Sequence, residues 1–193
     1  MTGRTHDAAA ITFLGAALII YPIPSVTLAT ALIAILANQI GGITPDIDQP
    51  TAPFWKNLPA ESFIGRIVDK LLGGHRFLTH SIIGAAAICW LAHWLLVFLH
   101  PIMPNVNISL VWWAFVIGIG SHLIMDTFTK EGVPWLLPLP VKIGLPPIKE
   151  FRITTGKAIE SFIIFPGLIV LDIYLIARHY DAVLLFAHTH LLS

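Results

Sequence analysis

The sequence predicts an all-α membrane protein, a polytopic helical bundle of about five transmembrane helices with one further amphipathic helix in the membrane interface. Three observations lead to this fold class. Hydrophobic residues make up 56% of the 193 residues and charged residues only 11%, an unusual balance for a soluble domain. Five apolar segments are each about long enough to cross a hydrocarbon core of ~30 Å. Charged residues gather in the connections between these segments. We expect residues 1–193 to form a single membrane-embedded domain.

The first two helices are expected at about residues 6–23 and 26–44. Pro22 and Pro24 between them enforce a tight turn, because proline fixes its own φ and pushes the preceding residue out of the helical region. The first apolar segment follows only one basic residue, Arg4, and lacks a small-residue cleavage site, so we interpret it as a retained helix rather than a signal peptide. The pair therefore forms a hairpin that returns to the membrane face where it began.

A polar connection follows, and it contains an amphipathic helix at about residues 60–72. Its apolar residues recur with helical spacing opposite Arg66, Asp69 and Lys70, as in helices that lie in the membrane interface. The apolar set is Phe63, Ile64, Ile67, Val68, Leu71 and Leu72. The alternative is a helix that simply covers the end of the bundle.

Three further spans are expected at about residues 80–99, 109–128 and 158–178. Between the last two, residues 129–157 contain five prolines, which exclude a long helix and predict an extended, membrane-hugging loop or a short hairpin. The tail, residues 180–193, can form an interfacial helix.

Basic residues are distributed very unevenly about this topology. Ten of the eleven fall on one side: Arg4, Lys56, Arg66, Lys70, Arg76, Lys130, Lys142, Lys149, Arg152 and Lys157. Only Arg178 falls on the other side. Because cytoplasmic loops of membrane proteins carry the excess of Lys and Arg, the N-terminus is predicted to be cytoplasmic and the C-terminus to lie outside.

His122 and Asp126 place an imidazole and a carboxylate at the end of an apolar helix. Four residues apart, they differ by about 40° around the helix axis and share one face. Facing lipid, such groups would cost several kcal/mol, near +3 for a central Asp on insertion scales. Metal coordination, pairing or a wet cavity must therefore compensate them.

Several further polar residues fall on the same predicted face. The full set is His6, Asp46, Asp48, His75, His80, His122, Asp126 and Glu160. Imidazoles and carboxylates are the ligands that zinc and similar divalent ions take where thiolates are absent, and the lone Cys89 excludes a cysteine-based site. In the alternative interpretation the aspartates cap a turn, the histidines are interfacial and Glu160 pairs with Lys157 or Arg152.

Four motifs together resemble a known family over residues 5 to about 165. They are Thr-Pro-Asp-Ile-Asp-Gln-Pro (44–50), Gly-His-Arg-Phe-Leu-Thr-His-Ser (74–81), Ser-His-Leu-Ile-Met-Asp-Thr-Phe-Thr-Lys-Glu-Gly-Val-Pro-Trp-Leu-Leu-Pro (121–138) and Gly-Lys-Ala-Ile-Glu (156–160). This set is similar to the YdjM/YbcI family, described as inner-membrane-bound, metal-dependent hydrolases. The resemblance implies a bacterial inner (plasma) membrane location. The sequence departs from the family at Phe77, where Gly usually follows His-Arg.

The order of the candidate ligands is also similar, more distantly, to zinc-dependent phospholipases C and single-strand nucleases. That similarity implies one metal held by Asp46, His75, His122 and Asp126, with Asp126 bridging to a second ion held partly by His6. The later His-x-x-x-acid pair of those enzymes is absent, so one or two zinc ions are expected. Asp48, His80 or Glu160 would complete the coordination.

The leading hypothesis is a metal-dependent hydrolase that acts on a phosphoester or lipid-like substrate at the cytoplasmic membrane face. Its candidate catalytic residues are Glu160 or Asp48 as the general base, with Arg76 to hold a phosphate and His80 beside them. The expected partners are the lipid bilayer and a small-molecule or lipid substrate. Nucleic acid is not expected, because the basic residues are spread over loops and balanced by acidic ones.

Two other functions use the same side chains. A small ion- or proton-coupled transporter would relay ions through the His and Asp residues, although only Asp172, His93 and His100 extend such a path across the bundle. A non-catalytic membrane protein would use the metal to hold helix ends together, with a closed set of four ligands.

Overall fold

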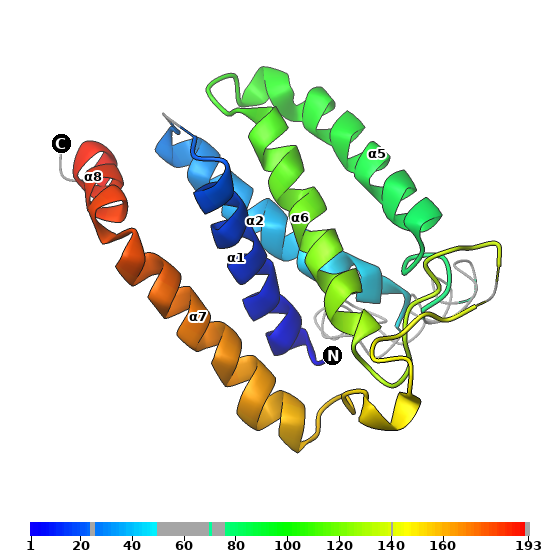
Figure 1. Ribbon diagram of the computed structural model, residues 1–193. Helices are drawn as coiled ribbons and strands as arrows, with labels where there is room; N and C mark the ends of the chain where they lie inside the picture. The colour runs from blue at the N-terminus through cyan, green and yellow to red at the C-terminus, as the bar shows by residue number, and fades with distance from the viewer. Residues whose placement is uncertain (24–25, 50–69, 71–75, 140, 192–193) are drawn as a thin grey trace, which may run out of the picture.

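The protein is a helical bundle (Figure 1). The computed structural model describes residues 1–23, 26–49, 70, 76–139 and 141–191. Within those ranges the regular structure is helical apart from two isolated β-bridges, Thr129 with Ile153 and Val133 with Ile143. The predicted all-α class is confirmed. The predicted interfacial helix at 60–72 falls, except for Lys70, outside the described residues.

Six α-helices make up the described bundle. They are α1 (Gly3–Ile20), α2 (Leu28–Ile43), α5 (Ile82–Leu99), α6 (Ile108–Thr127), α7 (Phe165–Arg178) and α8 (Tyr180–Leu191). Short turns extend them: η1 (Thr44–Asp48) continues α2, η2 (His100–Ile102) follows α5, and η4 (Glu160–Ile164) is a π-helical turn that leads into α7. Among the described residues of 129–157, the two β-bridges are joined by one helical element, the short turn η3 (Lys149–Phe151).

The first turns of three helices are closed by side chains that the sequence supplies just before each apolar run. The Thr27 hydroxyl accepts a hydrogen bond from the Thr30 amide, and the Ser81 hydroxyl accepts one from Gly84. The Asn107 side chain accepts a hydrogen bond from the Leu110 amide at the start of α6. These caps satisfy amide groups that would otherwise lack an acceptor at the helix start.

Four helical segments of the described chain are long and apolar enough to cross a membrane: Leu28–Asp48, Ile82–Ile102, Ile108–Thr127 and Glu160–Arg178. The α1 helix is not among them, because its first turns carry Arg4, His6 and Asp7. Only Gly84 is buried in α5, and none of the fully described residues of α7 is buried. These exposed apolar faces suit contact with lipid.

The α6 helix is the centre of the bundle. It packs against α1, α2 and α5, while α1 also packs against α7 (Figure 1). Eleven of its residues are buried, including Ser121, His122 and Asp126 near its C-terminal end. The predicted metal ligands His122 and Asp126 therefore lie in the helix that packs against α1, α2 and α5.

The α2 and α6 backbones touch at two glycines. A Cβ atom on Gly118 would lie 2.2 Å from the Asn38 carbonyl oxygen, and one on Gly41 would lie 2.3 Å from the Phe115 carbonyl oxygen. The buried Asn38 side chain also donates a hydrogen bond across the interface to the Ala114 carbonyl, at 3.0 Å. Small residues are what allow membrane helices to approach this closely.

We expect Gly118→Ala to lower the unfolding free energy by about 1–3 kcal/mol, because the added methyl group meets backbone atoms that have no room to move. Gly120→Ala is the matched control, since a Cβ there meets open space. The measurement is the thermal unfolding midpoint of both purified variants in the same detergent. Equal midpoints for the two variants would contradict the close contact.

Candidate metal centre

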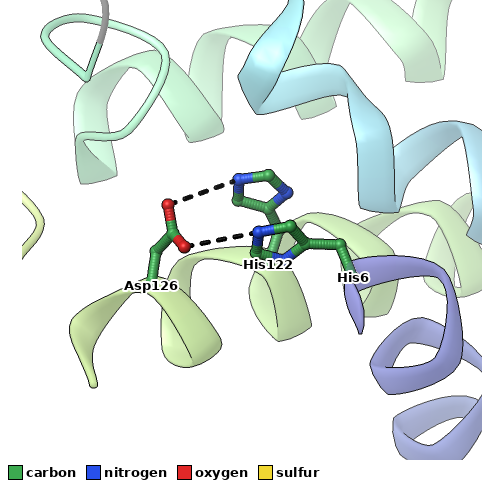
Figure 2. A group of neighbouring side chains, drawn as sticks. All are labelled: His6, His122 and Asp126. Atoms are coloured by element: carbon green, nitrogen blue, oxygen red, sulfur yellow. Dashed lines mark ion pairs between the residues drawn. The ribbon is translucent and has the colours of Figure 1, made fainter. Parts of the chain in front are cut away.

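A buried cluster of histidines and aspartates lies where α1, η1 and α6 meet the segment before α5. Its members are His6 from α1, Asp46 and Asp48 from η1, His80 from the segment before α5, and His122 and Asp126 from α6. All are buried except Asp46, which is 22% exposed. Figure 2 shows the Asp126 carboxylate facing the rings of both His6 and His122, which belong to different helices.

His122 has one ring nitrogen fixed and one available. Its Nδ1 lies 2.6 Å from the Gly42 carbonyl oxygen, which can only accept, so Nδ1 carries the proton. Its Nε2 therefore presents a lone pair to the cluster, 3.8 Å from the Asp126 Oδ2 atom one turn away. The glycine contact between α2 and α6 is what brings the Gly42 carbonyl to this ring.

Four donor atoms form a closed circuit at the centre of the cluster. His122 Nε2 lies 3.6 Å from Asp46 Oδ1, which lies 3.7 Å from His80 Nε2. His80 Nε2 is in turn 3.7 Å from Asp126 Oδ2, and the 3.8 Å contact back to His122 closes the circuit. Donor atoms around a tetrahedral zinc ion with bonds of about 2.0–2.2 Å stand about 3.3–3.6 Å apart. Three of the residues, Asp46, His80 and His122, form a group whose donor atoms all lie within 4.8 Å of one another, so they could hold a divalent ion.

His6 forms a second, overlapping group with His122 and Asp126. Its ring stacks on His122 at a centroid distance of 3.7 Å, and its Nε2 lies 3.3 Å from Asp126 Oδ1. Both ring nitrogens of His6, and Nε2 of His122, are buried without a hydrogen bond from the described residues. Because only Nε2 of His122 is available, the two groups compete for the same atom, which favours one ion.

Asp126 is neutralised by two cations. Its Oδ1 atom pairs with the Met1 amine, and its Oδ2 atom lies 2.5 Å from the Arg76 guanidinium. The side chain of Arg76 is only 4% exposed. It donates a hydrogen bond to the Thr129 hydroxyl at 2.9 Å. A buried carboxylate needs such partners, since leaving it unpaired would cost several kcal/mol.

Arg76 also has an unusual backbone. Its φ is 58°, in the left-handed region that non-glycine residues seldom adopt. In this conformation its amide donates to Asp48 Oδ2 at 3.1 Å. Strained backbone of this kind persists where the surroundings fix it, and it is often found at functional sites.

Asp48 lies behind His80 rather than inside the circuit. Its Oδ2 atom accepts the Arg76 amide and the Thr79 hydroxyl, and it stands 3.5 Å from His80 Nδ1. A carboxylate on the far nitrogen of a metal-binding histidine fixes the ring orientation and leaves Nε2 as the ligand atom. The structure therefore places Asp48 where it can orient His80.

The pKa of His80 is raised above its usual value. Burial acts to lower this pKa, but hydrogen bonds to Asp126 and Asp48, together with their negative charges, outweigh it. Protons and metal ions therefore compete for this ring at and above the ordinary titration range of histidine.

Glu160 is bound to the start of α1. Its Oε1 atom accepts hydrogen bonds from the Thr2 amide and hydroxyl, at 2.7 and 2.6 Å, and from the Thr5 hydroxyl at 2.7 Å. Its Oε2 atom accepts the Gly156 amide at 2.7 Å. A carboxylate is favourable at a helix N-terminus, so Glu160 anchors α1 and thereby the position of His6.

The structure thus brings four of the five predicted metal ligands together: His6, Asp46, His122 and Asp126. The fifth, His75, lies outside the described residues. Of the predicted catalytic residues, His80 stands within the donor circuit, Arg76 pairs with Asp126, and Asp48 and Glu160 have structural partners instead. Sequence analysis missed the Met1 amine and the Gly42 carbonyl, which no residue pattern marks.

Zinc affinity is expected to fall in a graded way across three variants. His122→Ala removes a ligand and should have the largest effect, whereas Asp48→Asn loosens His80 and should cost about 10–100-fold. His188→Ala, at an exposed position in α8, should bind zinc as the wild type does. Metal content after equilibrium dialysis measures all three. A wild-type value for His122→Ala would contradict the assignment.

Zinc binding is expected to weaken as the pH falls through the raised pKa of His80. In the metal-free protein, protonated His80 stabilises the fold most below the ordinary histidine pKa of 6.5, and this contribution is lost as pH rises through the raised pKa. An ion needs the neutral ring, so the apparent affinity should fall about tenfold per pH unit below that pKa. Calorimetric titrations between about pH 6 and 8 measure the effect and the protons released. A constant affinity would count against His80 as a ligand.

Comparison with known proteins agrees with the motifs. A family model described as the YdjM inner membrane protein matches residues 1–187, which include every residue of the cluster. The uncharacterized protein YvsG of Bacillus subtilis (strain 168) is 26% identical over 164 residues, which cover 85% of this chain and 88% of that protein. No solved structure matches the chain. The resemblance inferred from the four motifs is confirmed, and the chain belongs to the YdjM family of inner membrane proteins.

Proposed function

We propose that this protein is a metal-dependent hydrolase that acts on a phosphoester or lipid-like substrate at the cytoplasmic face of the inner membrane. The observation that carries the proposal is the circuit of four donor atoms with neighbouring separations of 3.6–3.8 Å, against which the Arg76 guanidinium lies. An isolated set of ligands would serve a structural ion equally well. The buried Arg76 guanidinium beside the ligands supplies the positive charge that a site for phosphate cleavage also needs.

Asp46, His80 and His122 are the proposed ligands of one zinc ion. They form a group whose donor atoms lie within 4.8 Å of one another, and two of them have orienting partners in Asp48 and the Gly42 carbonyl. Catalytic zinc sites commonly use three protein ligands. When bound, the ion would supply Lewis acidity, which polarises a phosphoryl oxygen and makes a water more acidic.

Arg76 and Asp126 are the proposed catalytic pair. The guanidinium can hold two oxygens of a phosphate in its planar fork, and in doing so it would leave Asp126 Oδ2. Asp126 is then able to accept the proton of the attacking water. The water oxygen bonds to phosphorus, the bond from phosphorus to the alcohol oxygen breaks, and the proton passes to the departing alcohol. This replaces Glu160 and Asp48 as the general base.

Orientation in the membrane follows from charge. The loop from 129 to 157, which carries five of the basic residues, joins α6 to η4 at the end of the bundle where the N-terminus lies (Figure 1). Basic residues favour the cytoplasmic side, so we place the cluster there. The α1 helix runs beside α2, α6 and α7, and we propose it as the fifth crossing.

A structural metal site is the second candidate function, and one observation favours it. Four protein donor atoms follow one another at separations of 3.6–3.8 Å, and four protein ligands are typical of zinc sites that only stabilise a fold. A transporter has less support, because the membrane carboxylate of Asp172 is engaged by the Thr12 hydroxyl at 2.6 Å. A satisfied acid of this kind does not require a water-filled path.

The deciding experiment measures zinc content and turnover on the same samples. The wild-type protein, loaded with zinc, is expected to hydrolyse bis(p-nitrophenyl) phosphate. Asp126→Asn should retain zinc but lose about 10²–10⁴-fold in turnover, the range for removing a general base. Asp181→Asn, at an exposed position in α8, is the matched control and should keep both.

Two outcomes would contradict the proposal. Full turnover by zinc-loaded Asp126→Asn would exclude Asp126 as the proton acceptor. Zinc-loaded wild-type protein that cleaves no phosphoester, while chelation lowers its unfolding midpoint, would assign the metal a structural role instead.

A further inference from the structure

An apolar groove of about 400 Å³ lies between the end of α6 and the start of α7. Met125 and Phe128 line it from one side, and Ile164, Gly167 and Leu168 line it from the other. Its size is within the range of small-molecule sites, and every lining residue among the described ones is apolar. None of the residues of the donor circuit lines it.

The groove reaches the polar cluster at its inner end. Met1 lines the groove, and its amine pairs with Asp126 Oδ1. Met125, on the groove wall, directly precedes Asp126 in α6. A molecule whose apolar part occupies the groove would therefore bring its polar end toward the Met1 amine, which pairs with Asp126.

The outer side of the groove faces the region expected to hold lipid. Its α7 wall belongs to the membrane-span candidate Glu160–Arg178, and the groove residue Ile163 is 64% exposed. The apolar walls of the groove suit a hydrocarbon chain, and the amine of Met1, which lines the groove, offers a cation to an anionic lipid headgroup. The hydrocarbon chain matches the walls, and the phosphate matches Arg76 and the Met1 amine.

Two local features keep the groove open. Gly167 sits inside a helix, where glycine costs about 1 kcal/mol relative to alanine, yet a Cβ there would meet open space. Close contact with another backbone therefore does not explain this glycine. Its missing side chain leaves space in the groove that Gly167 lines. The π-helical turn at Glu160–Ile164 directs Glu160 to α1 and Ile164 to the groove, and such turns are frequent at functional sites.

We propose that this groove binds an acyl chain of a phospholipid whose phosphate is the group cleaved at the metal centre. The inference rests on the proposed function for the identity of the cleaved bond. Binding of the chain and phosphate does not depend on turnover, so the two can be tested separately.

The binding test uses phosphatidylglycerol that carries a diazirine in its acyl chain, presented in phosphatidylcholine vesicles containing the full-length protein without metal. After irradiation, mass spectrometry is expected to find label on Met125, Phe128 or Leu168. Gly167→Leu, which fills the groove without a backbone clash, should reduce that label at least fivefold. Gly120→Leu is the matched control, because a Cβ at Gly120, as at Gly167, has no neighbour within 4 Å, and it should label as the wild type does.

The turnover test compares two substrates in the same variants. Gly167→Leu is expected to lower kcat/KM for phosphatidylglycerol at least tenfold more than it lowers kcat/KM for bis(p-nitrophenyl) phosphate. A parallel loss on both substrates, or no loss on either, would overturn the acyl-chain assignment.

Failure of the two proposals gives different results. Labelling of the groove without cleavage of any phosphoester would support a lipid site and refute the hydrolase. Cleavage of the soluble diester with label scattered over the lipid-facing surface of α5 and α7, unaffected by Gly167→Leu, would support the hydrolase and refute the groove.

Discussion

The burial of the Asp126 carboxylate is the constraint on which the rest of the structure depends. No part of it is exposed, and the helix that carries it is apolar enough to cross a membrane. A carboxylate in such surroundings is tolerated only with compensating partners, and here they come from the chain start, from Arg76 and from His6. Segments distant in sequence must therefore converge on the end of α6, and their convergence creates the candidate site.

Backbone packing sets the chemistry of the site as much as the side chains do. The glycine contact between α2 and α6 allows the Gly42 carbonyl to approach His122, and that hydrogen bond determines which ring nitrogen can hold a metal. A larger residue at Gly118 would separate the helices and release the ring. Helix packing therefore sets the orientation in which His122 could hold a metal ion.

The carboxylates of the site look alike in sequence but have different surroundings. Asp46 and Asp126 present oxygens to imidazole nitrogens, whereas Asp48 supports His80 from behind and Glu160 is committed to the first turn of α1. This division supports the proposed assignment, in which a few groups act on the substrate and others hold those groups in position. The apolar groove beside Met125 would extend the site toward the bilayer, where a lipid substrate resides.

The sequence by itself determined the helical class and the approximate helix positions, because apolar runs, caps and prolines act locally along the chain. It also determined that His122 and Asp126 share a face, since helix geometry fixes that relation. The tertiary structure alone decided that His80 stands inside the donor circuit and that Asp48 and Glu160 stand outside it. Those roles depend on distances between side chains of different helices, and a change of about 1 Å separates a ligand from a neighbour. Such distances arise from packing contacts such as that of Gly41 with Phe115, which no local pattern encodes.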